Sequence, residues 1–184
     1  MVVATPPALT IDEFLKLHGG ELGVELVRGQ VVRYPMPGFK HGRVCLNAAI
    51  VVGEFVRNVK TGRACSNDTF VRISDGTLRG ADVAYWSYSR LPQEGPVPDG
   101  VIDAPPELVV EVRSPSDLWT DMLGKMLDYI RAGVDVVVIL DLPTESASVY
   151  RSGTRQEMFE KDETLTIPDV LPGFAVPVAR FFEE

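Results

Sequence analysis

The sequence predicts a mixed α/β domain with a core sheet covered by helices on both faces. Leu108 to Arg113 is a short β-rich run, Asp117 to Ala132 has helical spacing of apolar residues, and Val134 to Leu140 is almost continuously β-branched, as in a strand buried on both faces. Strand, helix and strand in this order predict a right-handed parallel crossover. A second packed helix is predicted from His41 to Val59, where apolar and small residues recur with helical period.

Length and composition set the remaining bounds. A chain of 184 residues with 45% hydrophobic and 24% charged residues predicts one globular domain, residues 1–184. No segment has the apolar length of a membrane span, and the opening MVVATPPALTIDEF lacks the basic region of a signal peptide, so we expect a cytoplasmic protein without membrane contact. The formal net charge of -8 argues against general electrostatic binding of nucleic acid, so a DNA partner would require a local basic cleft or a metal ion.

The N-terminal third predicts a short helix and a hairpin. Thr10 to Glu13 forms a capping box at the start of a helix that ends at Gly19. Glu25 to Arg28 and Gln30 to Tyr34 are β-rich runs on either side of a glycine, which predicts a hairpin or a bulged strand.

Strand-like segments follow the second helix, at Thr69 to Ile73 and around Val83 to Trp86. The Pro- and Gly-rich segment from Leu91 to Pro106 predicts a long loop with a surface function or mobility. Ser116 or Asp117 is expected to cap the helix that starts there.

The C-terminal third predicts a small antiparallel meander and a last short helix. The meander comprises Ser146 to Arg151, Gln156 to Phe159 and Thr164 to Ile167, and the helix runs from Val178 to Phe182.

Two acidic residues interrupt apolar strands. In GADVAYWS, Asp82 lies at the start of a β-rich run, and Glu111 lies inside ELVVEVRSPSD, where an ionised carboxylate cannot simply be buried. Carboxylates that project from neighbouring strands form a hard-oxygen site suited to Mg²⁺ or Mn²⁺. Arg113 lies two residues beyond Glu111, on the same face of the strand.

Cysteine and histidine chemistry is not expected. Cys45 and Cys65 lie neither in a CxxC pair nor beside a spaced histidine, which favours buried small hydrophobes. His18 and His41 are too few and too far apart to indicate a zinc site. Any metal is therefore expected to be held by oxygen.

The order of motifs resembles the PD-(D/E)XK nuclease superfamily, and more closely the bacterial "putative restriction endonuclease" family called Uma. The motifs cover most of the chain: ELVRG, DVAYWS, PPELVVEVRSPSD, DMLGKMLDYIRAGV, the DLP that ends an apolar strand, and LPGF. The resemblance implies a restriction endonuclease-like fold, with a mixed central sheet flanked by helices.

The resemblance also implies site residues. It makes Asp82 and Glu111 the metal-binding acids, with the backbone carbonyl of Val112 as a further ligand. Arg113 occupies the position of the usual catalytic lysine; because arginine stays protonated, it could stabilise developing charge but not act as a general base. Lys125, in the following helix, matches the migrated lysine of many family members, and its alternative is a solvated residue paired with a nearby acid, Asp121.

Glu25 matches the glutamate of the early ELV motif, which completes the metal shell in related nucleases; the alternative is a surface charge on an edge strand. His41 is expected to be structural at the start of its helix, with a phosphate contact as the alternative. Ala81 replaces the family's proline before the first acid, a mild departure.

The implied activity is hydrolysis of DNA phosphodiester bonds by an Mg²⁺- or Mn²⁺-dependent endonuclease, with 5'-phosphate and 3'-hydroxyl products and a homodimeric assembly. One alternative is a catalytically weakened or inactive nuclease-like fold retained as a binding or regulatory module. Another is a hydrolase of a different phosphate ester or nucleotide, although the sequence contains no P-loop or dinucleotide fingerprint.

Overall fold

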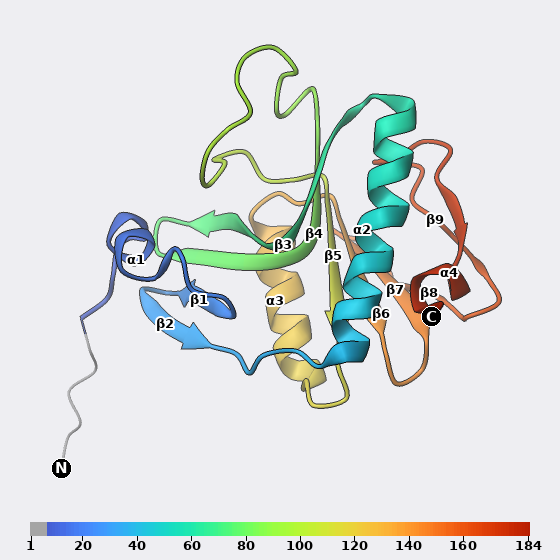
Figure 1. The fold of residues 1–184 in the computed structure, drawn as a ribbon, viewed down its shortest axis with the longest axis horizontal. Helices are drawn as coiled ribbons and strands as arrows, with labels where there is room; N and C mark the ends of the chain where they lie inside the picture. The colour runs from blue at the N-terminus through green and yellow to red at the C-terminus, as the bar shows by residue number, and fades with distance from the viewer. Residues whose placement is uncertain (1–6) are drawn as a thin grey trace.

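The computed structural model describes residues 7–184, which form a central sheet with helices packed on both of its faces (Figure 1). Residues 1–6, which begin the segment used above to argue against a signal peptide, lie outside the described part. Within residues 7–184, no helix combines the length and apolarity needed to cross a membrane.

The helices are separated along the chain by runs of two or more strands. In order the elements are α1 (Ile11–His18), β1 (Val24–Val27), β2 (Gln30–Arg33), α2 (Phe39–Val59), β3 (Gly62–Ser74), β4 (Thr77–Ser87), β5 (Leu108–Arg113), α3 (Trp119–Arg131), β6 (Val136–Asp141), β7 (Ser146–Arg151), β8 (Glu157–Phe159), β9 (Thr164–Thr166), β10 (Ala175–Pro177) and α4 (Ala179–Phe182).

The main sheet has the order β2-β1-β4-β5-β6-β7-β8, and β3 pairs with β4 off this path. Strands β5 and β6 are parallel, as the strand-helix-strand pattern predicts, whereas the other pairs are antiparallel. The sheet is therefore mixed, and β5 lies near its centre.

Alternation along β5 divides the core between two helices. Val110 and Val112 pack in the cluster that contains the buried face of α2, whereas Val109 packs in the cluster that contains the buried face of α3. Helices thus cover both faces, as predicted. Because successive side chains of a strand point to opposite faces, Glu111 shares the α3 face with Val109.

The N-terminal predictions are confirmed. Thr10 and Glu13 form the capping box at the start of α1, and Phe14 of α1 packs on the sheet in a cluster with Leu26 of β1. The hairpin of β1 and β2 turns at Arg28 and Gly29, both with positive φ, 51° and 77°.

The predicted cap of the helix after β5 is wrong. Helix α3 begins at Trp119, and its N-cap Leu118 makes no side-chain capping bond. Instead, the Asp117 carboxylate accepts a hydrogen bond from the Ser114 backbone N–H at 2.7 Å. Asp117 therefore closes the turn between β5 and α3 and leaves the helix uncapped by a side chain.

The predicted C-terminal meander forms with different pairing. Strands β7 and β8 extend the main sheet, and a separate two-stranded antiparallel sheet consists of β9 and β10. Ala147 and Val149 of β7 are buried in the main core, so the pairing of β7 with β6 is stabilised by the packing of these two side chains. Strand β10 was not predicted because Ala175–Pro177 is short and ends in proline.

Candidate active site

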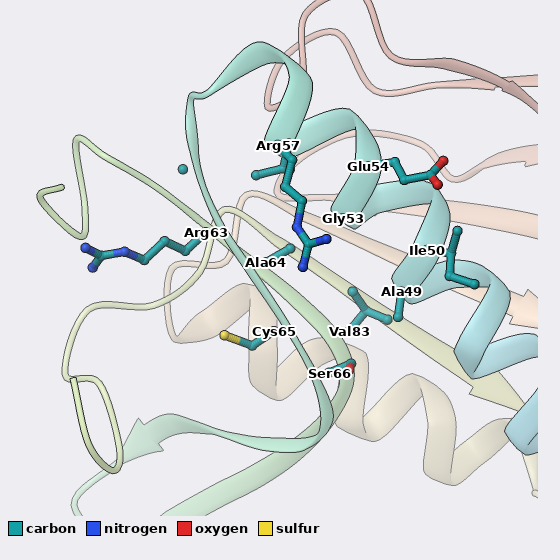
Figure 2. A pocket seen from close by; sticks show the side chains of 12 residues that line it. Ala49, Ile50, Gly53, Glu54, Arg57, Arg63, Ala64, Cys65, Ser66 and Val83 are labelled. Carbon is teal, nitrogen blue, oxygen red and sulfur yellow. The ribbon is translucent and has the colours of Figure 1, made fainter. Parts of the chain in front are cut away.

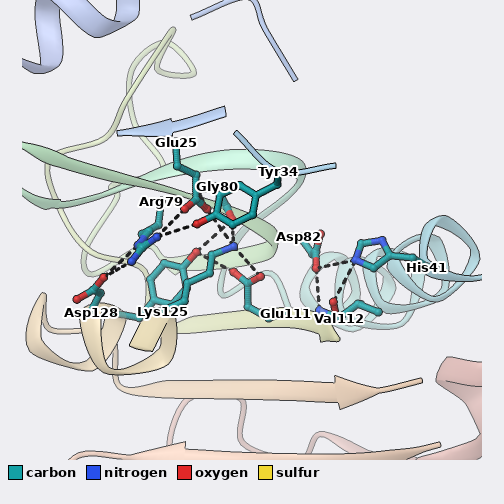
Figure 3. A network of polar contacts seen from close by, with 11 residues as sticks. Glu25, Tyr34, His41, Arg79, Gly80, Asp82, Glu111, Val112, Lys125 and Asp128 are labelled. Atoms are coloured by element: carbon teal, nitrogen blue, oxygen red, sulfur yellow. Dashed lines mark hydrogen bonds and ion pairs between the residues drawn. The ribbon is translucent and has the colours of Figure 1, made fainter. Parts of the chain in front are cut away.

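Glu111 of β5 lies buried beneath α3, where two side chains of that helix bind its carboxylate. Lys125 Nζ donates a hydrogen bond to Oε2 at 2.8 Å (Figure 3). The Tyr129 hydroxyl donates to Oε1 at 2.7 Å. Lys125 and Tyr129 are four residues apart, so they project from one face of the helix. Lys125 is thus bound inside the protein, and not to Asp121 as in its alternative interpretation.

Charges in this buried cluster shift one another's proton affinity. Burial raises the pKa of Glu111 to about 8; Lys125 acts in the opposite direction, and the Asp82 charge adds to the increase. Burial alone would lower the pKa of Lys125, but Glu111, together with other neighbouring groups, holds it well above its ordinary value. The lysine therefore carries a positive charge at neutral pH.

Glu25 joins the same lysine from β1. Its Oε1 lies 3.1 Å from Lys125 Nζ and accepts the Gly80 N–H at 3.0 Å, while Oε2 accepts a bond from Arg79 at 2.8 Å. Burial opposes the charged form, but Lys125 and Arg79 outweigh it and the pKa of Glu25 is lowered. Glu25 is 4% exposed and β1 is an inner strand, so the edge-strand surface charge considered for it is wrong.

Arg79, Asp128 and Tyr34 belong to this network and were missed in the sequence. Arg79 donates to Asp128 Oδ2 at 3.0 and 2.6 Å and to the Tyr34 hydroxyl at 3.1 Å. Burial, together with Glu25, raises the pKa of Tyr34 to about 12. These residues lie on β4, α3 and the segment after β2, so only the tertiary fold brings them together.

Asp82 of β4 lies on the side of Glu111 away from Lys125 and binds the backbone N–H of Val112, the next residue of β5. Its Oδ2 accepts the Val112 N–H at 2.7 Å and lies 3.8 Å from Nε2 of His41 (Figure 3). The same Nε2 lies 3.0 Å from the Val112 carbonyl oxygen. The two predicted metal-binding acids and the predicted carbonyl ligand thus lie around one strand segment.

A further carboxylate, Asp68, comes from an irregularity in β3. The register with β4 shifts between Ser66 and Thr69, and Asn67 and Asp68 have positive φ of 73° and 54°. Burial raises the pKa of Asp68, and the Asp82 charge adds to it, so the two acids lie within electrostatic reach. Bulges often change the direction of side chains beside functional sites. No pattern in the sequence predicted this bulge.

Arg113 lies on the α3 face as expected, but its contacts lie at the ends of β6 and α3. Its guanidinium donates to Asp141 Oδ1 at 2.6 Å and to the Asp117 carbonyl at 3.2 Å, and it stacks 4.7 Å from the ring centre of Trp119. The contacts described for Arg113 therefore join β5 to neighbouring elements. Lys125, by contrast, contacts the predicted metal-binding acid Glu111.

Cys45 lies beside His41, which corrects the expectation that neither cysteine has a spaced histidine. The two residues are four apart on α2, and Cys45 Sγ lies 3.3 Å from His41 Nδ1. One donor atom each of His41, Cys45 and Asp82 lie within 4.8 Å of one another. Burial raises the pKa of the Cys45 thiol well above its ordinary value, and the Asp82 carboxylate adds to this increase.

A pocket of about 510 Å³ lies between α2 and β3 (Figure 2). Arg57 and Arg63 contribute to its lining, as does Val83, the neighbour of Asp82. Asp82, Glu111 and Lys125 do not line it, so the acids and the lysine form a compact polar cluster outside this pocket.

Comparisons with known proteins were made on both sequence and structure. Residues 11–179 match the family model Uma2, described as "Putative restriction endonuclease". The crystal structure of a "putative nuclease belonging to DUF820" from Anabaena variabilis is 24% identical, covers 95% of this chain and 97% of its own, and gives a TM-score of 0.83, which shows a shared fold. No protein with a curated function matches the sequence significantly.

Proposed function

Because the chain belongs to the Uma2 family, described as "Putative restriction endonuclease", we propose that it is an Mg²⁺- or Mn²⁺-dependent endodeoxyribonuclease. The observation that carries the proposal is the buried contact of Lys125 with Glu111, 2.8 Å long, on the strand that also binds Asp82. The two acids that the family resemblance assigns to the metal, Asp82 and Glu111, thus both contact β5 or belong to it, and the Lys125 ammonium lies beside Glu111.

The donor set fits a hard divalent cation. Asp82, Glu111 and the Val112 carbonyl offer oxygen ligands, which Mg²⁺ and Mn²⁺ prefer. Burial raises the pKa of Glu111 to about 8 despite the opposing effect of Lys125, and a cation bound at its carboxylate would favour the ionised form. A cation held by these residues would supply Lewis acidity to a phosphate oxygen and to an attacking water.

The protein's own groups have separate roles in this proposal. Asp82 is oriented by the Val112 N–H, and Glu111 by the Tyr129 hydroxyl. The Lys125 ammonium would stabilise negative charge that develops on the phosphate, while Glu25 holds the ammonium in place from the opposite side. Glu25 is thus proposed as a positioning residue, with the completion of the metal shell as its alternative.

Arg113 is proposed to support the site from a distance. With its guanidinium bonded to Asp141 at 2.6 Å, it fixes the end of β5 against β6. The charge-stabilising role considered for Arg113 would require it to leave this partner.

The expected substrate is DNA, cut to give 5'-phosphate and 3'-hydroxyl ends, and we propose a homodimer because cleavage of both strands of a duplex commonly uses two sites. In the nuclease reaction His41 is proposed to hold the end of β5 through this strand's backbone and not to contact the phosphate, since its Nε2 lies 3.0 Å from the Val112 carbonyl oxygen.

The proposal is tested by nicking of supercoiled plasmid in Mg²⁺ or Mn²⁺. Glu111→Ala and Lys125→Met are each expected to reduce nicking by about 10²-fold or more, because each removes a group that stabilises the transition state. Glu94→Gln, in the exposed loop, is the matched control and should retain activity. Arg113→Lys should retain more activity than Lys125→Met.

Nicking that survives Glu111→Ala would point to a contaminating nuclease and reject the proposal. Absence of nicking by the folded wild type in both metals, on duplex, single-stranded DNA and RNA, would favour the inactive binding module. The net charge of -8 is the observation that supports this second candidate.

A further inference from the structure

A second set of metal-binding donors lies on the α2 side of Asp82. His41 and Cys45 are four residues apart on α2, so both project from one helix face toward β4. Nδ1 of His41 lies 3.3 Å from Cys45 Sγ, and one donor atom each of His41, Cys45 and Asp82 lie within 4.8 Å of one another. A thiol, an imidazole and a carboxylate from two elements thus converge on one point.

The hydrogen bonds of His41 select the nitrogen that faces the thiol. The Val112 carbonyl oxygen can only accept, so Nε2, 3.0 Å away, must be its donor. In the neutral ring Nδ1 then has a free lone pair, and it is the nitrogen beside Cys45 Sγ. Histidines that bind metals commonly donate their other ring N–H to a carbonyl in this way.

The third ligand is held in a similar way. Asp82 Oδ2 accepts the Val112 N–H at 2.7 Å, which fixes the direction of the carboxylate. The side chains of His41 and Asp82 are 14% and 12% exposed, which leaves limited access for a fourth, exogenous ligand. Catalytic and exchangeable zinc sites have three protein ligands and one open position.

From this geometry we propose that His41, Cys45 and Asp82 form a site for a thiolate-preferring divalent metal of the Zn²⁺ class. Tetrahedral zinc with one sulfur and two N/O ligands places its donors about 3.3–3.8 Å apart. The 3.3 Å separation of Nδ1 and Sγ is already in this range. The three donor atoms lie within 4.8 Å of one another, so the other separations would have to shorten by at most about an ångström. Thiolate and imidazole ligands select Zn²⁺ over Mg²⁺, which the all-oxygen set around Glu111 would favour.

The two sites share the Asp82 carboxylate, so two divalent cations bound there would repel each other at close range. Zn²⁺ would therefore compete with the Mg²⁺ or Mn²⁺ of the proposed nuclease; this consequence alone rests on the proposed function. Metal binding at His41 and Cys45 requires no cleavage activity and is tested independently of it.

The test is titration of the metal-free protein with Co²⁺, which absorbs strongly in the near ultraviolet only when a thiolate coordinates it. We expect one thiolate-bound Co²⁺ per chain in the wild type, displaced by Zn²⁺. Cys45→Ser should abolish the near-ultraviolet band, and Asp82→Asn should weaken Co²⁺ binding on the order of tenfold. The matched control is Cys65→Ser, at the exposed cysteine of β3, which should retain the band.

The Cys65→Ser chain keeps Cys45 as its sole thiol. It therefore tests metal binding at Cys45 even if Cys45→Ser fails to fold. Absence of the band in folded Cys65→Ser at saturating Co²⁺ would overturn the site. So would a band of full intensity in Cys45→Ser, because it would place the metal on Cys65. Weak visible absorption without the thiolate band would place Co²⁺ on oxygen ligands and equally reject the proposal.

Discussion

At the scale of single residues, Glu111 illustrates how an acid becomes tolerable inside a strand. It is 4% exposed, yet its two oxygens are bonded to Lys125 and Tyr129. Burial of an unpaired carboxylate costs several kcal/mol, so the helix that covers β5 has to supply the partners. Glu111 therefore depends on the packing of α3 as well as on its own strand.

The raised pKa of Glu111 predicts a pH dependence of stability. Between its ordinary value of 4.5 and about 8, the folded protein holds a proton that the unfolded chain releases. Stability in EDTA should therefore fall as pH rises through this window, with a contribution from Glu111 of up to about 1.4 kcal/mol per pH unit. Urea denaturation at pH 5, 6.5 and 8 measures it.

Glu111→Gln removes this titration and should give a flatter dependence than the wild type. Glu94→Gln serves as the control and should leave the slope unchanged. Identical slopes for the wild type and Glu111→Gln would show that Glu111 does not take up a proton on folding in this window.

At the scale of elements, the turn between β1 and β2 carries strain that its sequence does not relieve. Arg28 has φ of 51° and Gly29 φ of 77°, the pattern of a turn that favours Asn-Gly. The Arg28 backbone N–H donates to Thr77 Oγ1 at 3.0 Å, and asparagine at this position would retain this donor.

Arg28→Asn should therefore stabilise the protein by roughly 0.5–1 kcal/mol, because asparagine adopts positive φ at lower cost. The midpoint of urea denaturation measures the change. Gly29→Ala is the opposing variant, since its added Cβ would lie 2.5 Å from the Ala8 Cβ and it should destabilise the protein. A lower midpoint for Arg28→Asn would contradict this account of the turn.

At the scale of the whole molecule, the net charge of -8 constrains how DNA can bind. Phosphates are repelled by an acidic surface unless a bound cation or a local basic group intervenes. The acids Asp68, Asp82 and Glu111 interact electrostatically at the proposed site, so repulsion is expected to be strongest where the phosphate must approach.

DNA binding is therefore expected to depend on a divalent cation. Fluorescence anisotropy of a labelled duplex at fixed ionic strength should show at least about tenfold tighter binding in Ca²⁺, which also takes oxygen ligands, than in EDTA. Asp82→Asn should remove most of this difference, whereas Asp99→Asn in the exposed loop should retain it. Equal affinity in Ca²⁺ and EDTA would mean that binding does not use these acids.

The sequence by itself determined the mixed α/β class, the parallel pairing of β5 with β6, and the motif order of the Uma2 family, because periodicity and local spacing encode them. It also identified Asp82, Glu111 and Lys125 as candidate site residues.

Only the tertiary structure decided that Lys125 contacts Glu111, that Arg113 pairs with Asp141, and that β9 pairs with β10. The same is true of the meeting of His41, Cys45 and Asp82. These contacts join residues distant in the chain, and their partners are selected by packing and by the desolvation of buried charges, neither of which local sequence records.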